Sequence, residues 1–334
     1  MNTTAVERMR RSATAAVRAR FYASRRARLL AARARPRALV LVYHRIAHSN
    51  VDPFGQAVAP ANFTRHLSML RSRYEVIDVP ALLADLDGRG LRNGTVVVTF
   101  DDGYADVLEN GVPAAATQQV PLLLFVTVAP ILAGGQFWWD ELAAALAANS
   151  EVRELHVDGE TLSLDGDDER AATYKLLHAR LKRLPADARQ SQLEVILHDL
   201  PEREEGDFGR PLTADELRAF AATPGLAVGA HTVSHPSLGA LVEEEQRHEL
   251  VESRRSLEKL IGRRVDTLAY PFGKEPDVGH KTRTLAAEAG YAAAFTSVAR
   301  PVTPRSDLYA LPRLSVHDWT ERELAQRLHA IFGF

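Results

Sequence analysis

The sequence contains no cysteine among its 334 residues. A disulfide framework, a thiolate metal site and a cysteine nucleophile are therefore excluded, which is compatible with a reducing compartment. No run of about 18 or more consecutive apolar residues occurs, so no transmembrane helix is predicted. The first residues also lack the apolar segment that follows the charges of a secretory signal peptide. These absences lead us to expect a cytoplasmic protein.

Acidic residues are nearly absent from the start of the chain. Residues 1–37 hold eleven arginines against the single acid Glu7, a net charge of +10, although the whole chain has a net charge of −2. The remaining residues therefore carry a net charge of −12. Alanine is abundant in this segment, and neither glycine nor proline precedes Pro36, so the segment favours a helix. We predict a basic, helical N-terminal extension over residues 1–37.

This extension has two interpretations. Its apolar residues recur between the arginines at helical spacing, as in a basic helix that lies on an anionic membrane surface. Residues 1–34 would then attach the protein peripherally to the inner face of a membrane. The alternative is a solvated extension without a partner. Nucleic acid is not an expected partner, because the rest of the chain is acidic and carries no matching motif. The apolar residues concerned are Val6, Met9, Ala13, Val17 and Phe21.

Strand and helix patterns alternate through most of the remaining chain. About seven short apolar runs read as buried strands, the first at 38–43, and helical patterns separate them. This alternation indicates parallel βαβ units, with a functional site at the carboxyl ends of the strands. The length fits one α/β barrel with insertions, and an apolar content of 46% supports a sizeable core. We predict such a barrel over residues 38–334.

The alternation breaks at about residues 134–215. Helical patterns at 140–148, 168–183 and 187–199 surround a short alternating run at 152–164, without a clear parallel strand. The small strand content indicates a largely helical insertion into the barrel rather than an independent domain.

Two adjacent carboxylates, Asp101 and Asp102, close the buried strand that contains Val96 to Val98. Side chains alternate along an extended chain, so the two carboxylates should point in different directions from one strand end. One can therefore bind a metal while its neighbour faces a reacting water. The alternative is an ordinary acidic turn at Gly103.

Two histidines follow the apolar run that ends at Gly229. His231 and His235 are spaced i, i+4, which can place both imidazoles on one side of a tight loop. Two histidines and one carboxylate, with a position left open for water, form a ligand set typical of hydrolytic zinc sites. The alternative is a pair of surface or capping histidines. The presence of both motifs at strand ends favours the metal site.

The segments 99–103 and 231–235 resemble the first two signature motifs of the polysaccharide deacetylases, the NodB-homology group or carbohydrate esterase family 4. The resemblance implies a distorted (β/α)7 barrel over roughly residues 38–320, less the insertion. It implies that Asp101 is the catalytic base. The metal ligands would be Asp102, His231 and His235.

The third family motif, usually Arg-x-Pro-Tyr-Gly, reads Ala-Tyr-Pro-Phe-Gly over residues 269–273. The backbone N–H of Phe272 can still face an oxyanion. The arginine that would orient the base is missing from the motif. Arg313, at the end of the last expected strand, is a candidate to replace it, the alternative being an exposed surface arginine.

The family's carboxy-terminal histidine motif, which supplies the general acid, is absent. His329 lies within the helical pattern of 321–332, whereas His44 ends the buried strand 38–43. His44 is therefore our candidate for the acid. This arrangement resembles the circularly permuted branch that includes the poly-N-acetylglucosamine deacetylases, in which the strand bearing the acid comes first.

Four further residues are candidates for substrate binding. Trp138 and Trp139 form a sugar-stacking platform or anchor the insertion to the barrel. Asp140 hydrogen-bonds a sugar hydroxyl or caps the following helix. Tyr270, in the third motif, completes the set.

The predicted reaction is metal-dependent hydrolysis of an N-acetyl group on a carbohydrate, with release of acetate. Zinc is the expected metal, and the ligand set also accepts cobalt, nickel or iron. One alternative is a deacetylase or deformylase that acts on a nucleotide-linked or lipid-linked sugar, which the absence of a signal peptide favours. Another is a carbohydrate-binding or membrane-associated protein without activity.

Overall fold

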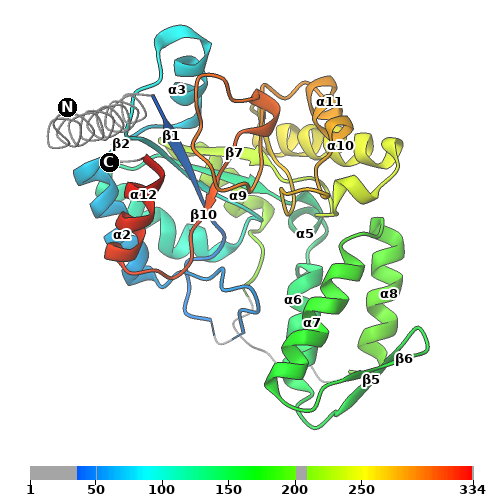
Figure 1. The fold of residues 1–334 in the computed structure, drawn as a ribbon. Helices are drawn as coiled ribbons and strands as arrows, with labels where there is room; N and C mark the ends of the chain where they lie inside the picture. The colour runs from blue at the N-terminus through cyan, green and yellow to red at the C-terminus, as the bar shows by residue number, and fades with distance from the viewer. Residues whose placement is uncertain (1–35, 50, 201–208, 333–334) are drawn as a thin grey trace, which may run out of the picture.

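The computed structural model describes residues 36–49, 51–200 and 209–332, and a curled parallel sheet forms its centre (Figure 1). The predicted helix of residues 1–34 lies outside the described residues and stays a prediction. Every residue of β1 and β3 is buried, as expected for apolar strands covered on both faces. The strands of the sheet are β1 (Ala38–Tyr43), β2 (Glu75–Val76), β3 (Thr95–Phe100), β4 (Leu122–Val126), β7 (Leu226–Ala230), β8 (Thr267–Ala269), β9 (Ala293–Phe295) and β10 (Leu314–Ser315).

The strand order is β10-β1-β3-β4-β7-β8-β9, with β2 paired beside β3. The first strand thus lies between the third and the last, with Leu41 opposite Leu314. Just before β10, Leu311 forms a parallel bridge with Phe295 of β9, which brings the two ends of the sheet together. The predicted distorted α/β barrel is confirmed, as a parallel sheet curled into a half-barrel with helices around it.

Helices cover the outside of the sheet, and several have clear sequence signals at their ends. Thr320 and Glu323 exchange backbone and side-chain hydrogen bonds at the start of α12, and Thr213 and Glu216 do the same at α9. The covering helices are α2 (Pro60–Arg73), α3 (Val79–Ala84), α4 (Val112–Gln118), α5 (Val128–Ala133), α9 (Ala214–Ala222), α10 (Glu243–Ile261), α11 (His280–Glu288) and α12 (Glu321–Phe332). Short helical turns complete them at η1 (Asp85–Arg89), η2 (Val107–Gly111), η3 (Leu238–Ala240) and η4 (Leu308–Ala310).

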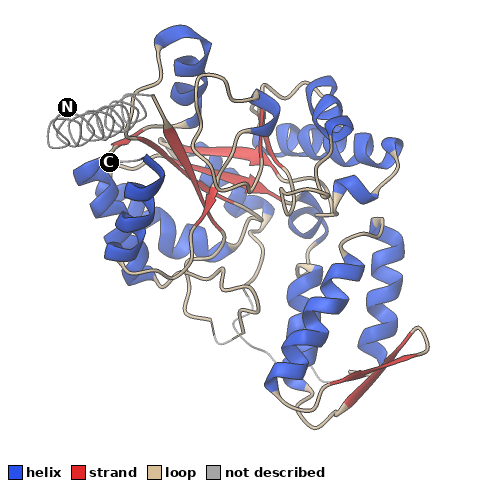
Figure 2. Ribbon diagram, in the orientation of Figure 1, coloured by secondary structure: helices blue, strands red, loops and turns tan. Residues whose placement is uncertain are grey.

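A group of elements between β4 and β7 projects from the barrel, and we call it the helical lobe (Figure 2). Its hairpin is antiparallel and separate from the main sheet. The lobe occupies residues 138–198, inside the range predicted as an insertion, whereas α9 packs against β7 of the barrel. Its elements are α6 (Trp138–Ala148), β5 (Glu154–Val157), β6 (Glu160–Ser163), α7 (Asp167–Leu181) and α8 (Ala186–His198).

The segment 309–316 differs from its sequence pattern. The apolar run predicts a continuous strand, but the structure has the turn η4 followed by the two-residue strand β10. Pro312 interrupts the run and cannot donate a hydrogen bond to a neighbouring strand. Helices α4 and α5 and the short strand β2 were not expected from the pattern. No helix within the described ranges has the length and apolar character needed to cross a bilayer.

Candidate functional site

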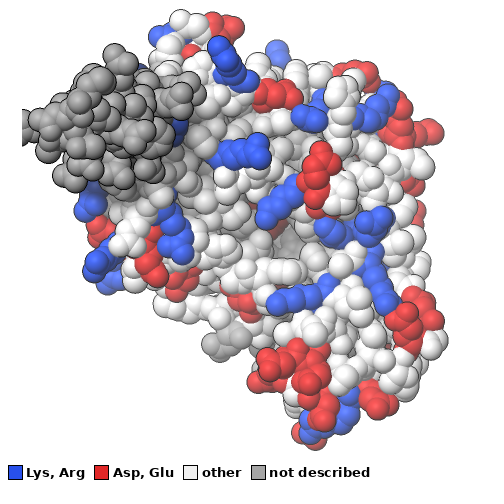
Figure 3. Space-filling model, in the orientation of Figure 1, with Lys and Arg blue, Asp and Glu red and all other residues white. Residues whose placement is uncertain are grey.

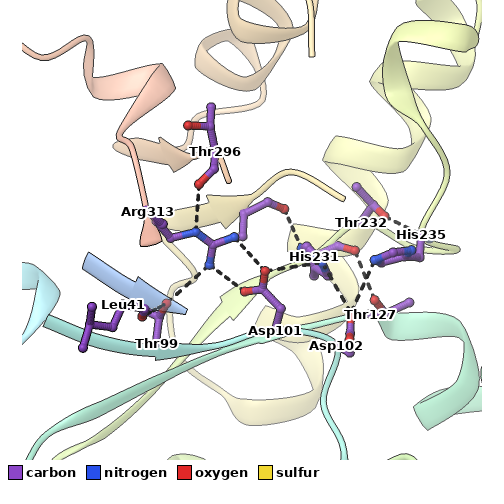
Figure 4. A network of polar contacts seen from close by, with 11 residues as sticks. Leu41, Thr99, Asp101, Asp102, Thr127, His231, Thr232, His235, Thr296 and Arg313 are labelled. Carbon is purple, nitrogen blue, oxygen red and sulfur yellow. Dashed lines mark hydrogen bonds and ion pairs between the residues drawn. The ribbon is translucent and has the colours of Figure 1, made fainter. Parts of the chain in front are cut away.

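The predicted chemical groups emerge together at the carboxyl ends of neighbouring strands. Asp101 and Asp102 follow β3, His231 follows β7 and His44 follows β1, while Phe272 lies three residues beyond β8. Figure 4 shows the central part of this arrangement, with the two aspartates and His231 facing one another. Because parallel strands end at one rim of the barrel, residues far apart in the sequence reach one site.

Three side chains converge as candidate metal ligands. One ligand atom from each of Asp102, His231 and His235 lies within 4.8 Å of the others. The Oδ1 atom of Asp102 is 3.5 Å from Nε2 of His231 and 3.3 Å from Nε2 of His235. All three residues are buried. The sequence prediction placed these three residues together, and the structure brings them together.

The imidazoles are in the state that a metal needs. His231 Nδ1 donates a 2.7 Å hydrogen bond to the carbonyl of Ala269, which leaves Nε2 with a free lone pair. Burial lowers the pKa of His231 to about 4 and that of His235 to about 3, so both rings are neutral near pH 7. His235 Nδ1 is buried without a hydrogen-bond partner among the described residues. Two neutral imidazoles and one buried carboxylate fit a divalent cation.

The backbone is strained around these groups. Six residues other than glycine have positive φ in the described part of the chain, and four of them lie at the site. Such conformations cost about 1–3 kcal/mol each and cluster where the surrounding structure holds a functional geometry in place. The four are Asp102, Thr232, His235 and Phe272.

Arg313 holds Asp101 through a two-pronged contact. Its two terminal nitrogens donate to the two carboxylate oxygens of Asp101, each at 2.6 Å, and its Nε donates to the carbonyl of Thr296 at 3.1 Å. Although burial alone would raise the pKa of Asp101, the adjacent Arg313 guanidinium lowers it to about 2. Arg313 is fully buried rather than an exposed surface arginine. Asp101 is therefore ionised and fixed in orientation.

The remaining catalytic candidates have different positions. His44 is half-buried at the rim, and burial lowers its pKa while Asp102 and Asp101 oppose that shift. The backbone N–H of Phe272 has no acceptor within the described segments. His329 lies on the exposed face of α12, beside Arg65 and Arg73 of α2, and lines a different cavity. The structure therefore places His44 at the site and His329 outside it.

A cavity of about 480 Å³ opens over these groups, and we call it the site cavity. Aromatic rings form part of its wall, and two of them, Trp139 and His178, come from the helical lobe. Lys182 of the lobe lies 4.3 Å from the centre of the Phe272 ring. Rings of this kind suit the apolar faces of a pyranose. The lobe therefore builds one side of the cavity, together with Phe54 from the barrel.

Three predicted substrate-binding residues do not line this cavity. Trp138 stacks on His178 with ring centres 4.9 Å apart, which matches the anchoring alternative. Asp140 accepts a 2.6 Å hydrogen bond from the Tyr104 hydroxyl, so it neither caps its helix nor faces the cavity. Tyr270 is buried and donates to the carbonyl of Tyr309. Their placement does not favour direct sugar contact, whereas Trp139 lies in the cavity wall.

Two charged residues hold the loop between the histidine ligands. Glu249 of α10 accepts hydrogen bonds from the backbone N–H groups of Val233 and Ser234, at 2.7 and 3.0 Å, and from the Ser234 hydroxyl. Arg189 of α8 donates to the carbonyl of Ser234 at 2.7 Å. The loop is thus fixed by the barrel on one side and by the helical lobe on the other.

Sequence reasoning did not identify His178, Lys182, Arg189 or Glu249 as part of the site. His178, Arg189 and Glu249 lie within helices, and Lys182 directly follows α7. None of the four has a local motif around it, and each reaches the site only through tertiary packing. The helical patterns 168–183 and 187–199 predicted α7 and α8 but not the faces of these helices that meet the site.

The polysaccharide deacetylase family model matches residues 199–294, which include both histidine ligands and the Phe272 turn. Over this segment the chain is similar to the polysaccharide deacetylase family. The Bacillus subtilis (strain 168) protein YxkH, named for the same family, is 24% identical over 105 residues. That match covers 31% of this chain and only 36% of YxkH.

Two solved structures share the fold of this chain. The Streptococcus pyogenes deacetylase PplD, in complex with acetate, aligns with a TM-score of 0.59 and 17% identity, over 88% of this chain and 99% of PplD. IcaB from Ammonifex degensii aligns with a TM-score of 0.57 and 17% identity, over 88% of this chain and 97% of IcaB. At 17% identity, these likenesses show a shared fold and nothing further.

Proposed function

We propose that this protein is a metal-dependent hydrolase that removes an N-acetyl group from a sugar of a glycan and releases acetate. The observation that carries the proposal is the ionised Asp101, held by Arg313 beside the convergent ligands Asp102, His231 and His235. The match of residues 199–294 to the polysaccharide deacetylase family model and the fold shared with an acetate-bound deacetylase support it.

The ligand set suggests the metal chemistry. A divalent cation held by Asp102, His231 and His235 would supply Lewis-acid polarisation of water and of the amide carbonyl. Zinc is the first candidate, and two imidazoles with one carboxylate also accept cobalt, nickel or iron.

The chain's own groups divide the proton transfers. Asp101 is ionised and faces the ligands, so it can accept the proton of the attacking water. The Phe272 N–H, which has no acceptor among the described residues, is available to the negative charge that develops on the carbonyl oxygen. His44 lies at the same rim and delivers a proton to the leaving amine. Its ring must gain that proton during the cycle, and the nearby aspartates favour the charged form.

Acetate release from purified protein tests the proposal. The substrates are N-acetylglucosamine oligomers of two to five sugars and a lipid-linked N-acetyl sugar, and the protein is stripped with chelator and reloaded with Zn²⁺, Co²⁺, Ni²⁺ or Fe²⁺. We expect activity with at least one metal and a loss of about 10²-fold or more in Asp101→Asn. Metal-loaded protein that releases no acetate from any substrate, or an Asp101→Asn variant with undiminished turnover, would overturn it.

A further inference from the structure

We propose that a second cavity beside the site cavity binds a phosphate group of the substrate, so that the natural substrate is a phosphate-bearing glycan. This inference rests on the proposed function. We call the second cavity the basic cleft. It has a volume of about 650 Å³, and its basic lining residues are Lys274, Arg283, Arg300 and Arg305.

The basic cleft adjoins the site cavity directly. Lys274 lines both cavities, and the consecutive residues Thr296 and Ser297 line the cleft and the site cavity respectively. The boundary is tight: a Cβ atom on Gly273 would lie 2.5 Å from the Ser297 nitrogen, which itself donates to the Gly273 carbonyl at 2.8 Å. Two short backbone segments therefore separate the cavities, and the proposed ligand would extend over them from one cavity to the other.

Acidic partners among the described residues match only part of the positive charge of the cleft. Lys274, Arg300 and Arg305 form no ion pair with any described residue, and only Arg283 has an acidic partner, Asp307 at 3.3 Å. Glu275 is the other acid in the lining. The cleft therefore has an excess of basic groups on a chain whose residues after 37 are acidic overall.

The distribution of charge on the surface agrees with this local excess. Figure 3 shows several lysine and arginine side chains across the middle of the face, with an acidic side chain among them. Acidic side chains gather along the upper right edge and at the lower end of the helical lobe. The site cavity adds Lys175, which also forms no ion pair among the described residues. Basic groups around two adjoining cavities attract an anion and concentrate it there.

The arrangement of the cations favours phosphate. They come from three segments: Lys274 from the turn after β8, Arg283 from α11, and Arg300 and Arg305 from the β9–η4 loop. A tetrahedral phosphate presents acceptor oxygens in several directions, so cations on different walls can contact it together. A planar carboxylate is satisfied by a single arginine fork.

A matched pair of substrates tests the inference. N-acetylglucosamine oligomers of two to five sugars are compared with the same oligomers bearing a reducing-end phosphate, by kcat/KM for acetate release and by equilibrium binding. The variant is Arg300→Ala with Arg305→Ala, since neither residue lines the site cavity. The control removes the same charge from the exposed side of α10, with Arg255→Ala and Lys259→Ala.

For at least one oligomer length, we expect the wild-type protein and the α10 control to prefer the phosphorylated form by about tenfold or more. The cleft variant should lose most of this preference and keep its kcat/KM for neutral oligomers. Equal use of both forms by the wild type, or an unchanged preference in the cleft variant, would overturn the inference. If oligomers that end in a carboxylate are preferred over neutral oligomers as strongly as the phosphorylated ones, the cleft binds anions in general, and the specific inference of a phosphate is wrong. If no oligomer is hydrolysed, the proposed hydrolase function is wrong. The equilibrium binding of phosphorylated and neutral oligomers then still decides whether the cleft binds phosphate.

Discussion

Arg313 donates to both carboxylate oxygens of Asp101, and the two residues are 212 positions apart in the chain. The contact exists because β10, which follows Arg313 directly, pairs beside β1, whose other neighbour β3 ends next to Asp101. The Asp101 N–H also donates to the carbonyl of Tyr43, at the end of β1. Arg313, which directly precedes the last strand, thus makes the contact with Asp101 that no arginine of the segment 269–273 can make.

Arg313→Lys should keep the metal and lower kcat. Lysine retains the positive charge, but a single ammonium cannot hold both oxygens of Asp101 in the fork geometry. We expect kcat to fall by about tenfold or more, with metal content unchanged. Metal analysis and acetate release on one preparation check this. Wild-type kcat in the lysine variant would show that the fork does not orient the base. Arg313→Ala is unsuitable for kinetics, because an unpaired buried carboxylate costs about 3–5 kcal/mol of folding stability.

Arg189→Met should weaken metal binding without touching a ligand. The change keeps an apolar stem against Trp138 but removes the hydrogen bond to the Ser234 carbonyl, so the loop that carries His235 loses its support from the helical lobe. We expect zinc affinity to fall by about tenfold, with altered absorption bands in the Co²⁺-loaded protein.

The matched control for this change is Arg180→Met, which removes an arginine of the same lobe whose ion pair with Glu160 lies at the surface. It should bind zinc as the wild type does. Equal losses in both variants would point to a general destabilisation of the lobe rather than to the loop.

Metal affinity should be nearly independent of pH between 8 and 6. Burial holds the pKa of His231 at about 4 and that of His235 at about 3, so protons do not compete for the imidazoles in this range. An exposed pair with the ordinary pKa of about 6.5 would lose roughly tenfold in affinity by pH 6. Competition with a chromogenic chelator measures the dependence. A tenfold loss of affinity between pH 8 and 6 would contradict neutral, buried ligands.

Acid should also lower the folding stability of the metal-free protein through His231 and His235. In the metal-free protein the folded-state pKa of both histidines lies below the unfolded value, so the unfolded chain binds more protons at acidic pH. Their contribution to stability is therefore complete above about pH 6.5 and is lost as pH falls toward 4.

The parts of the site that could be predicted are those with a local signal. The adjacent carboxylates Asp101 and Asp102 end an apolar run, and the spacing of His231 and His235 is visible in one short segment. Parallel-strand topology then requires that strand ends meet at one rim. Long-range packing has no such signal. The contact of Arg189 with Ser234 depends on how the helical lobe lies against the barrel, and the periodicity of apolar residues in the sequence does not indicate this packing.

The same limit applies to the aromatic residues. The sequence does not distinguish the roles of the adjacent residues Trp138 and Trp139. In the first turn of α6, Trp138 packs against His178 and Arg189. Trp139 packs against His235, with ring centres 4.4 Å apart. Helical geometry separates consecutive side chains by about 100°, and only the position of the neighbouring helices decides which of the two meets the cavity.

Deletion of residues 1–34 should leave turnover on a soluble substrate unchanged and weaken binding to anionic vesicles. The reason is the net charge of +10 over residues 1–37, since each basic residue near an anionic surface contributes about 1 kcal/mol of attraction. Co-sedimentation with phosphatidylserine vesicles at low and high salt measures the effect. Equal recovery with and without the segment would show that it is not a membrane anchor.

The identity of the general acid can be decided by two histidine variants. His44 follows β1 at the rim, within the electrostatic reach of Asp101 and Asp102, whereas His329 lies on α12 beside α2. A positioned acid contributes about 10²–10⁴ in rate, so His44→Ala should lower kcat on that scale with metal content and fold preserved. His329→Ala should change kcat by less than about threefold, or about 0.7 kcal/mol of barrier. Both are measured on one substrate at equal metal occupancy. An inactive His329→Ala beside an active His44→Ala would move the acid away from the first strand, and the permuted arrangement would lose its chemical basis.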